Sequence, residues 1–101
     1  MQDYLDQHRN DADFMQAYEE TLEDLRVAVA LARMREQRKL TQIALAERSN
    51  MTQAQIARIE NGQIPELPTL RKLLVALDAE LTMRPDGSVD IKPVRGEATA
   101  A

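Results

Sequence analysis

Apolar residues recur along the first third of the chain at the spacing of one stripe of an α-helix. They stand in steps of four, four, three and four residues, at Phe14, Tyr18, Leu22, Leu25 and Val29. No glycine or proline interrupts the chain between residues 11 and 62. The pattern therefore predicts a long amphipathic helix from about residue 12 to 38, ending in the basic stretch RMREQRK.

Two short helices with clear start signals are expected next. Thr41 can cap a helix through residue 48, and Asn50 tolerates the left-handed backbone of the turn that follows. Thr52 and Gln55 then form a T-x-x-Q capping box, which starts a second helix. Helices this short are unstable alone, so both must share a core with their neighbours.

Turn signals and alternation organise the rest of the chain. Asn61 and Gly62 end the second short helix, and IPELP at 64–68 is a rigid connector. Leucines at 70, 73, 74 and 77 then repeat as on a further amphipathic helix. The stretch ELTMRPDGSVDIKPV carries an Asp-Gly turn between two alternating segments, which predicts a β-hairpin.

These elements divide the chain into four parts. We expect an acidic arm or helix extension at 1–20, a helical domain at 21–79, a β-hairpin at 80–94 and a disordered tail at 95–101. If the chain pairs with a second copy, the hairpin and the extended first helix are the two elements expected to offer the contact, and the sequence does not decide between them.

Composition narrows the class of protein. There is no cysteine, which excludes disulfides and thiolate metal sites. The longest apolar run, VAVALA at 27–32, falls far short of the ~20 residues of a membrane span. The first residues are polar and acidic, unlike a signal peptide. A soluble cytoplasmic protein is the expectation.

Charge is unevenly distributed along the chain. Residues 1–25 carry eight acids and one base, whereas residues 26–72 carry nine bases and four acids. A polyanion would be repelled by the first segment and attracted by the second, although the net charge is −4. The middle of the chain is therefore the candidate nucleic-acid contact.

The stretch TQAQIARIENG at 52–62 has the composition of a reading surface. On a helix, Ile56 and Ile59 fall on one side, and small, amide and guanidinium side chains occupy the rest. A purely solvated face would more often carry Lys and Glu. Glutamine suits adenine, arginine suits guanine and an alanine methyl suits thymine in the major groove, which favours nucleic-acid recognition.

The segment LTQIALAERSNMTQAQIARIENG, residues 40–62, resembles the helix-turn-helix of the lambdoid repressor and Cro-like (XRE) family. The matching landmarks are Leu40-Thr41-Gln42, Leu45-Ala46, the turn at Asn50, Thr52-Gln53, and Ile56 followed by Ile59-Glu60-Asn61-Gly62. Family members usually have glycine where Asn50 stands, and many have glycine at Asp78-Ala79. The resemblance implies an all-α, lambda-repressor-like bundle of four to five helices, with a long N-terminal helix and a short C-terminal β-hairpin.

The resemblance also implies roles for individual residues. Those expected to face base edges are Gln53, Ala54, Gln55 and Arg58. Those expected at DNA phosphates are Gln42, Thr52, Asn61 with the backbone near Gly62, and Gln63, while Arg38 and Lys39 add nonspecific attraction. Arg35 and Glu60 match an internal ion pair. For Gln55, a purely capping role explains the sequence equally well.

The arrangement around the motif is similar to HigA-type antitoxins of bacterial type II toxin-antitoxin modules. LEDLRVAVALARMREQRKLTQ precedes the motif and PELPTLRKLLVALDAELTMRP follows it. The resemblance implies a homodimer with two partners, which are double-stranded operator DNA and a small basic RelE/HigB-like mRNA-cleaving toxin. The aromatic residues Tyr4, Phe14 and Tyr18 lie in the acidic segment, where they suit docking onto a basic protein or extend the protein's own core.

Other classes remain as alternatives. A stand-alone, phage-like repressor would keep DNA binding without a toxin, and a protein-interaction module would have lost DNA binding. An enzyme is not expected, because the single histidine is His8 and no metal-ligand cluster, phosphate-binding loop or catalytic set appears. No cofactor is expected either.

Overall fold

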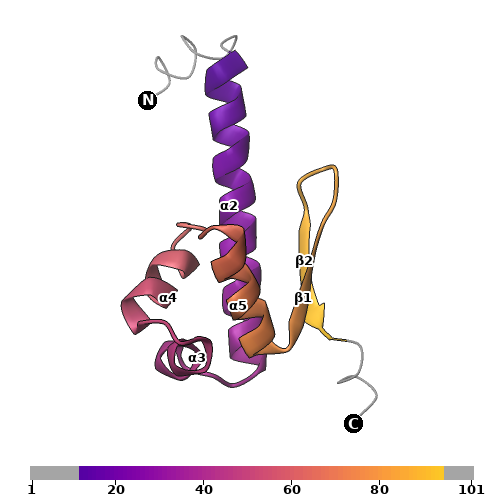
Figure 1. Ribbon diagram of the computed structural model, residues 1–101. Coiled ribbons are helices and arrows are strands. Elements are labelled where there is room, and N and C mark those ends of the chain that lie inside the picture. Colours follow the sequence, from indigo (N-terminus) through magenta and orange to yellow (C-terminus); the bar gives the residue numbers. More distant parts are fainter. Residues whose placement is uncertain (1–11, 95–101) are drawn as a thin grey trace.

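The computed structural model describes residues 12–94, and within them it confirms the expected fold. Four helices precede one antiparallel hairpin (Figure 1). Their bounds are α2 Ala12–Gln37, α3 Gln42–Ser49, α4 Gln53–Glu60, α5 Leu67–Leu77, β1 Ala79–Met83 and β2 Val89–Pro93. Tyr4 and the tail at 95–101 lie outside the described residues. Among helices α2 to α5, none combines the length and apolar character that a membrane crossing requires.

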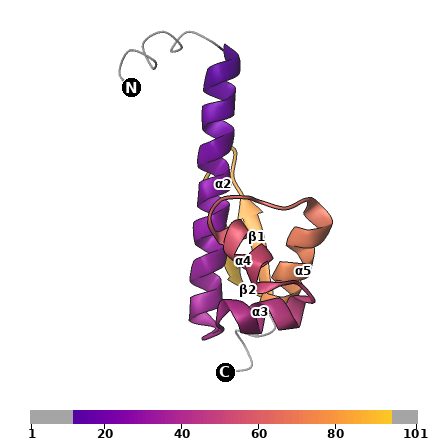
Figure 2. The same ribbon diagram turned by 90° about the vertical axis from the view of Figure 1, so that its left-hand side faces the viewer.

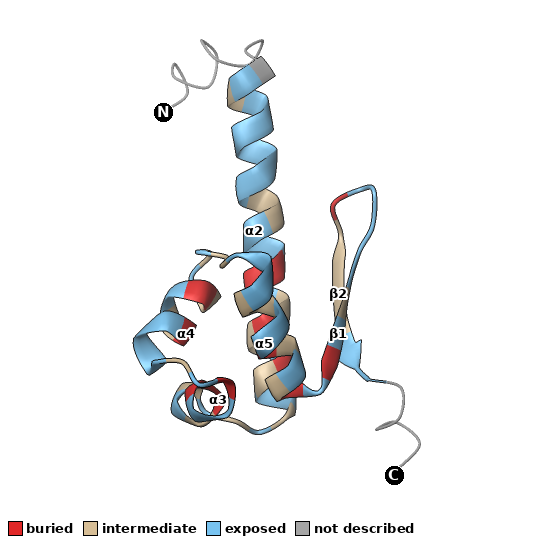
Figure 3. Cartoon of the chain, viewed as in Figure 1, coloured by how far each residue is buried: buried red, intermediate tan, exposed pale blue. Residues whose placement is uncertain are grey.

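The core forms where α3, α4 and α5 pack around the C-terminal half of α2, while the N-terminal half of α2 projects beyond them (Figures 1 and 3). Its largest fully buried side chains are Met34, Ile56, Leu73 and Leu77. Leu45 and Ala46 of α3 belong to the same cluster, so all four helices contribute to one shared core, as the short helices require.

The buried face of α2 is not the stripe that the periodicity emphasised. The buried residues of α2 are Val27, Ala28, Leu31 and Met34. Tyr18, Leu25 and Val29 are instead 50%, 45% and 46% exposed. The helix carries two apolar stripes on opposite sides, and the less conspicuous one, with an alanine and a methionine, faces the core.

The hydrogen bonds expected at the starts of α3 and α4 are present in the structure. The Thr41 hydroxyl accepts a hydrogen bond from the amide of Ala44 at 3.0 Å. The Thr52 hydroxyl accepts from the Gln55 amide at 3.1 Å, and the Gln55 side-chain oxygen accepts from the Thr52 amide at 2.9 Å. Asn50 adopts φ 57°, so asparagine supplies the left-handed turn in place of glycine.

The hairpin is joined to α5 through a second left-handed residue. Asp78 has φ 50° and ends α5 where many family members place glycine. The Arg38 guanidinium donates to the carbonyls of Leu77 and Asp78, both at 2.9 Å, which ties the end of α2 to this joint. The strands pair Leu81 with Ile91 and continue to the Asp-Gly turn.

Candidate nucleic-acid interface

Helix α4 presents one buried and one exposed face. Ile56 and Ile59 are only 1% and 5% exposed, so packing against the core fixes the rotation of the helix. The four side chains expected to read bases, Gln53, Ala54, Gln55 and Arg58, are all exposed. The side of the domain that carries α4 faces the viewer in Figure 2. The core thus turns the predicted base-reading residues outward.

A shallow depression lies along one flank of α4. It measures about 260 Å³ and is lined by Met51, Gln55, Arg58, Ile59, Gln63, Pro65 and Thr69. The structure therefore brings together Gln55 and Arg58, expected at bases, with Gln63, expected at a phosphate. Neighbouring base-edge and phosphate contacts are the arrangement that a helix in a major groove requires.

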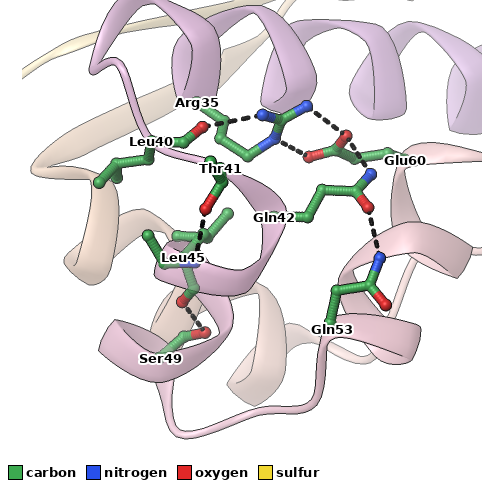
Figure 4. A network of polar contacts seen from close by, with 9 residues as sticks. Arg35, Leu40, Thr41, Gln42, Leu45, Ser49, Gln53 and Glu60 are labelled. Carbon is green, nitrogen blue, oxygen red and sulfur yellow. Dashed lines mark hydrogen bonds and ion pairs between the residues drawn. The ribbon is translucent and has the colours of Figure 1, made fainter.

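Arg35 of α2 makes two hydrogen bonds to the end of α4 and one to the segment that precedes α3 (Figure 4). Its Nε and Nη2 donate to the two carboxylate oxygens of Glu60 at 2.6 and 3.0 Å, and its Nη1 donates to the Leu40 carbonyl at 2.8 Å. The hydrogen bond to Glu60 raises the pKa of Arg35, so the guanidinium stays charged. The pair holds α4 at a fixed position on α2.

The same carboxylate is connected to the base-reading face through Gln42. Gln42 Nε2 donates to Glu60 Oε1 at 3.0 Å, and Gln42 Oε1 accepts from Gln53 Nε2 at 2.7 Å (Figure 4). An ionised carboxylate can only accept, so Gln42 turns its NH₂ toward Glu60 and its oxygen toward Gln53. Gln53 keeps one N–H and its oxygen for an outside partner, which matches the acceptor and donor of adenine N7 and N6.

The expected phosphate contacts at the start of the motif are compatible with these bonds. Gln42 keeps a second N–H, and the Thr52 hydroxyl, which accepts from Gln55, keeps its proton for donation. Gln55 does serve the capping box, through its oxygen. Its NH₂ remains for a base, so capping and reading are not alternatives for this side chain.

At the end of α4 the backbone amides already donate hydrogen bonds within the protein. The amides of Gly62 and Gln63 donate to the carbonyls of Ile59 and Arg58, both at 3.0 Å, and close the helix. A phosphate contact here would therefore come from the side chains of Asn61 and Gln63, which are exposed, rather than from the backbone.

The two expected nonspecific cations differ in their surroundings. Lys39 is exposed, whereas Arg38 is half-buried and donates to the two carbonyls at the end of α5. A phosphate would have to compete with those bonds for the Arg38 guanidinium. The structure gives Arg38 a role in holding the fold that sequence reasoning missed.

The bond between Gln42 and Gln53 was also missed. These are the first residues of α3 and α4, and the turn between the helices brings the two helix starts together. One feature of the sequence could have indicated this bond. Gln42 and Gln53 each follow a threonine at the N-cap of a helix, Thr41 and Thr52.

Comparison with known proteins agrees with this geometry. The profile of the family described as helix-turn-helix matches residues 31–83, just over half of the chain. No curated protein and no solved structure gives a significant match. The matched region spans α3, α4 and α5 and ends with β1. The chain belongs to the XRE/Cro-like helix-turn-helix family of sequence-specific DNA-binding regulators.

Proposed function

We propose that the protein is a HigA-type antitoxin. It represses its own operon as a homodimer bound to operator DNA through α4, and it neutralises a RelE/HigB-like mRNA-cleaving toxin through its acidic N-terminal part. The observation that carries the proposal is the separation of two chemically different surfaces. The exposed face of α4, with amide, alanine and arginine side chains, lies on the domain, while the acidic half of α2 projects away from it (Figure 1). Such a chain can hold an anionic and a cationic partner at once.

The DNA-binding part is tested with two base-face variants. Gln53→Ala and Arg58→Ala should each cost about 1–3 kcal/mol at the matching base pair of the operator. Gel shifts with the protein's own promoter, competed by random DNA, measure the effect. Gln16→Ala and Arg71→Ala are matched controls on exposed positions of α2 and α5 and should leave binding unchanged. Equal loss on promoter and random DNA for Gln53→Ala would exclude base reading by this residue.

Substitution of Gln42 should have two effects on DNA binding in the same assay. A residue that touches only phosphate would weaken all sequences alike. Because Gln42 also holds Gln53 at 2.7 Å, we expect Gln42→Ala to weaken all DNA and, in addition, to relax the preference at the base pair that Gln53 reads. A uniform loss would show that the bond to Gln53 does not matter for recognition.

The toxin-binding part is tested on the acidic segment. Glu20 and Asp24 are exposed acids on the projecting half of α2. The double variant Glu20→Gln/Asp24→Asn should slow association with a basic toxin, most clearly at low salt, and leave operator binding unchanged. The aromatic residues Tyr4 and Phe14 are further candidates for the same contact. Unchanged toxin affinity in the charge variant would remove this segment as the docking site.

Gene neighbourhood separates the proposal from its closest alternative. A short adjacent reading frame for a small basic RelE-like protein, and its co-purification with this chain, would support the antitoxin. Operator binding without such a neighbour would indicate a stand-alone repressor. Absence of any preference for the promoter would indicate a protein-interaction module. In each case we propose a cytoplasmic binding protein without catalytic activity or cofactor.

A further inference from the structure

Helix α2 carries an apolar stripe that the protein's own core does not cover. Its members, here called the α2 seam, are Met15, Tyr18, Leu22, Leu25 and Val29. Leu22 is half-buried, and the other four are between 39% and 50% exposed. At 100° per residue the seam lies opposite the buried residues of α2. An apolar patch of this length on a soluble domain marks an interface.

The spacing of the seam indicates what covers it. Its members follow one another in steps of three, four, three and four residues, which is the 3.5-residue period of a coiled coil. With Met15 at position a, the seam fills successive a and d positions. Side chains at this period interdigitate best with those of another helix, so the expected occupant is a helix of the same kind.

Charge beside the seam identifies the helix and its direction. The same heptad places Glu19, Arg26 and Arg33 at successive e positions. In an antiparallel pair, e positions face e positions, so Glu19 of one copy meets an arginine of the other. In a parallel pair, e positions face g positions, so Arg26 and Arg33 would meet Thr21 and Ala28. Glu19 would meet Phe14, so none of the three would meet an opposite charge. We propose that the seam is covered by α2 of a second copy of this chain, running antiparallel.

A groove beside the seam fits this arrangement. It measures about 520 Å³ and lies between α2 and the hairpin, lined by Leu22, Leu25, Arg26, Val29, Ala30, Arg33, Asp86, Ser88 and Val89. Its lining is mostly apolar and carries two arginines and one acid, Asp86, which leaves one net positive charge. The N-terminal half of α2 brings the complementary set, with Met15 and Tyr18 beside Glu19. The projecting half of each copy would lie along the groove of the other.

The direction also suits binding to one DNA duplex. In Figure 2, α4 is on the side toward the viewer and α2 forms the left edge, with the other helices to its right. A twofold axis along that line of sight, placed beside the seam, makes the two α2 helices antiparallel and leaves both α4 helices facing the viewer. A twofold axis along α2 would turn the second α4 away. The antiparallel pair therefore presents both α4 helices on one side, as a palindromic operator requires.

The proposal rests on the homodimer of the proposed function and is tested without DNA or toxin. A dimer that both seam variants leave intact would overturn the seam alone, whereas a monomer would overturn the homodimer as well. Sedimentation equilibrium of the full chain should show a dimer. Tyr18→Glu lies on the projecting half of α2, away from the core, and should raise the dimer dissociation constant about 100-fold or more by burying an unpaired charge. Val29→Glu is the second seam variant. Val75→Glu, at a 70% exposed position of α5, is the matched control and should leave the dimer intact.

The antiparallel direction of the two α2 helices is tested by charge reversal and crosslinking. Glu19→Arg and Arg26→Glu should each weaken the dimer, and the double variant should restore it. The chain has no cysteine, so single-cysteine variants crosslink only at the chosen site. A mixture of Tyr18→Cys and Val29→Cys should form the mixed disulfide dimer, whereas each alone should not. Self-crosslinking by each alone would overturn the antiparallel direction. A monomeric wild type, or a dimer unaffected by both seam variants, would overturn the seam as the interface.

Discussion

The ion pair between Arg35 and Glu60 leads to a quantitative stability prediction. The substitution Arg35→Met removes two hydrogen bonds to the carboxylate and one to the Leu40 carbonyl. It leaves the charge of Glu60 in place, on a side chain that is only 10% exposed. Removing one partner of a buried ion pair costs about 3–5 kcal/mol. Because the two side chains keep 15% and 10% of their exposure, we expect the lower end, about 3 kcal/mol.

This loss is measurable by urea unfolding followed by far-UV circular dichroism. A domain of this size has an unfolding free energy of about 4–12 kcal/mol, so the variant should remain mostly folded at 25 °C. The same loss should lower the thermal midpoint by about 12–24 °C. The slope of free energy against urea should not change, because the folded state buries the same surface.

Two further variants test whether the ion pair itself causes the loss of stability. Arg71→Met on the exposed face of α5 should change stability by no more than about 0.5 kcal/mol. The double variant Arg35→Met/Glu60→Leu removes both charges and should lose less than the sum of the two single losses. Strictly additive losses, or an Arg35→Met loss as small as that of Arg71→Met, would refute the assignment of stability to this pair.

Three further predictions concern local geometry. Thr52→Ala removes the acceptor that caps α4 and should cost about 1 kcal/mol in the same urea assay; no loss would mean that the cap is dispensable. Gly62→Ala should cost about 1–3 kcal/mol, because Gly62 has φ 108° and a Cβ there would lie 3.2 Å from Leu25; a stabilised variant would contradict this. The Ser88 side chain and amide lower the pKa of Asp86 below its usual 3.8, a contribution to stability present above that pKa and lost as pH falls through the lower folded value. Ser88→Ala should move the Asp86 midpoint upward in an NMR carboxyl titration, and an unchanged midpoint would contradict the hydrogen bond.

Local signals in the sequence were sufficient for the elements. Caps, turn residues and the leucine repeat depend on contacts within a few residues, and the structure has them at Thr41, Thr52 and Asn50. The Asp-Gly turn likewise produced a hairpin with Leu81 opposite Ile91. Such features depend on residues a few positions apart, so they form irrespective of which elements pack around them.

The face of α2 that packs inward could not be predicted in the same way. Both of its stripes have helical period, and the choice depends on which surface α3, α4 and α5 present to it. The bond from Gln42 to Gln53 has the same origin, since it exists only because the turn brings two helix starts together. The exposed face of α4 was more predictable, because Ile56 and Ile59 leave only one rotation that buries both.

The chain of bonds from Glu60 through Gln42 to Gln53 has a consequence for how the regulator can diverge. Guanine presents two acceptors in the major groove, so reading it with both atoms of a side chain takes two donors. Gln53 has already given one N–H to Gln42 and offers outward one donor and one acceptor. The bonds that begin at this carboxylate would thereby exclude guanine, but not adenine, at the base pair that we expect Gln53 to read. Reading guanine at that position would therefore take a substitution of Gln42, which frees the second N–H of Gln53, or a residue with more donors at position 53.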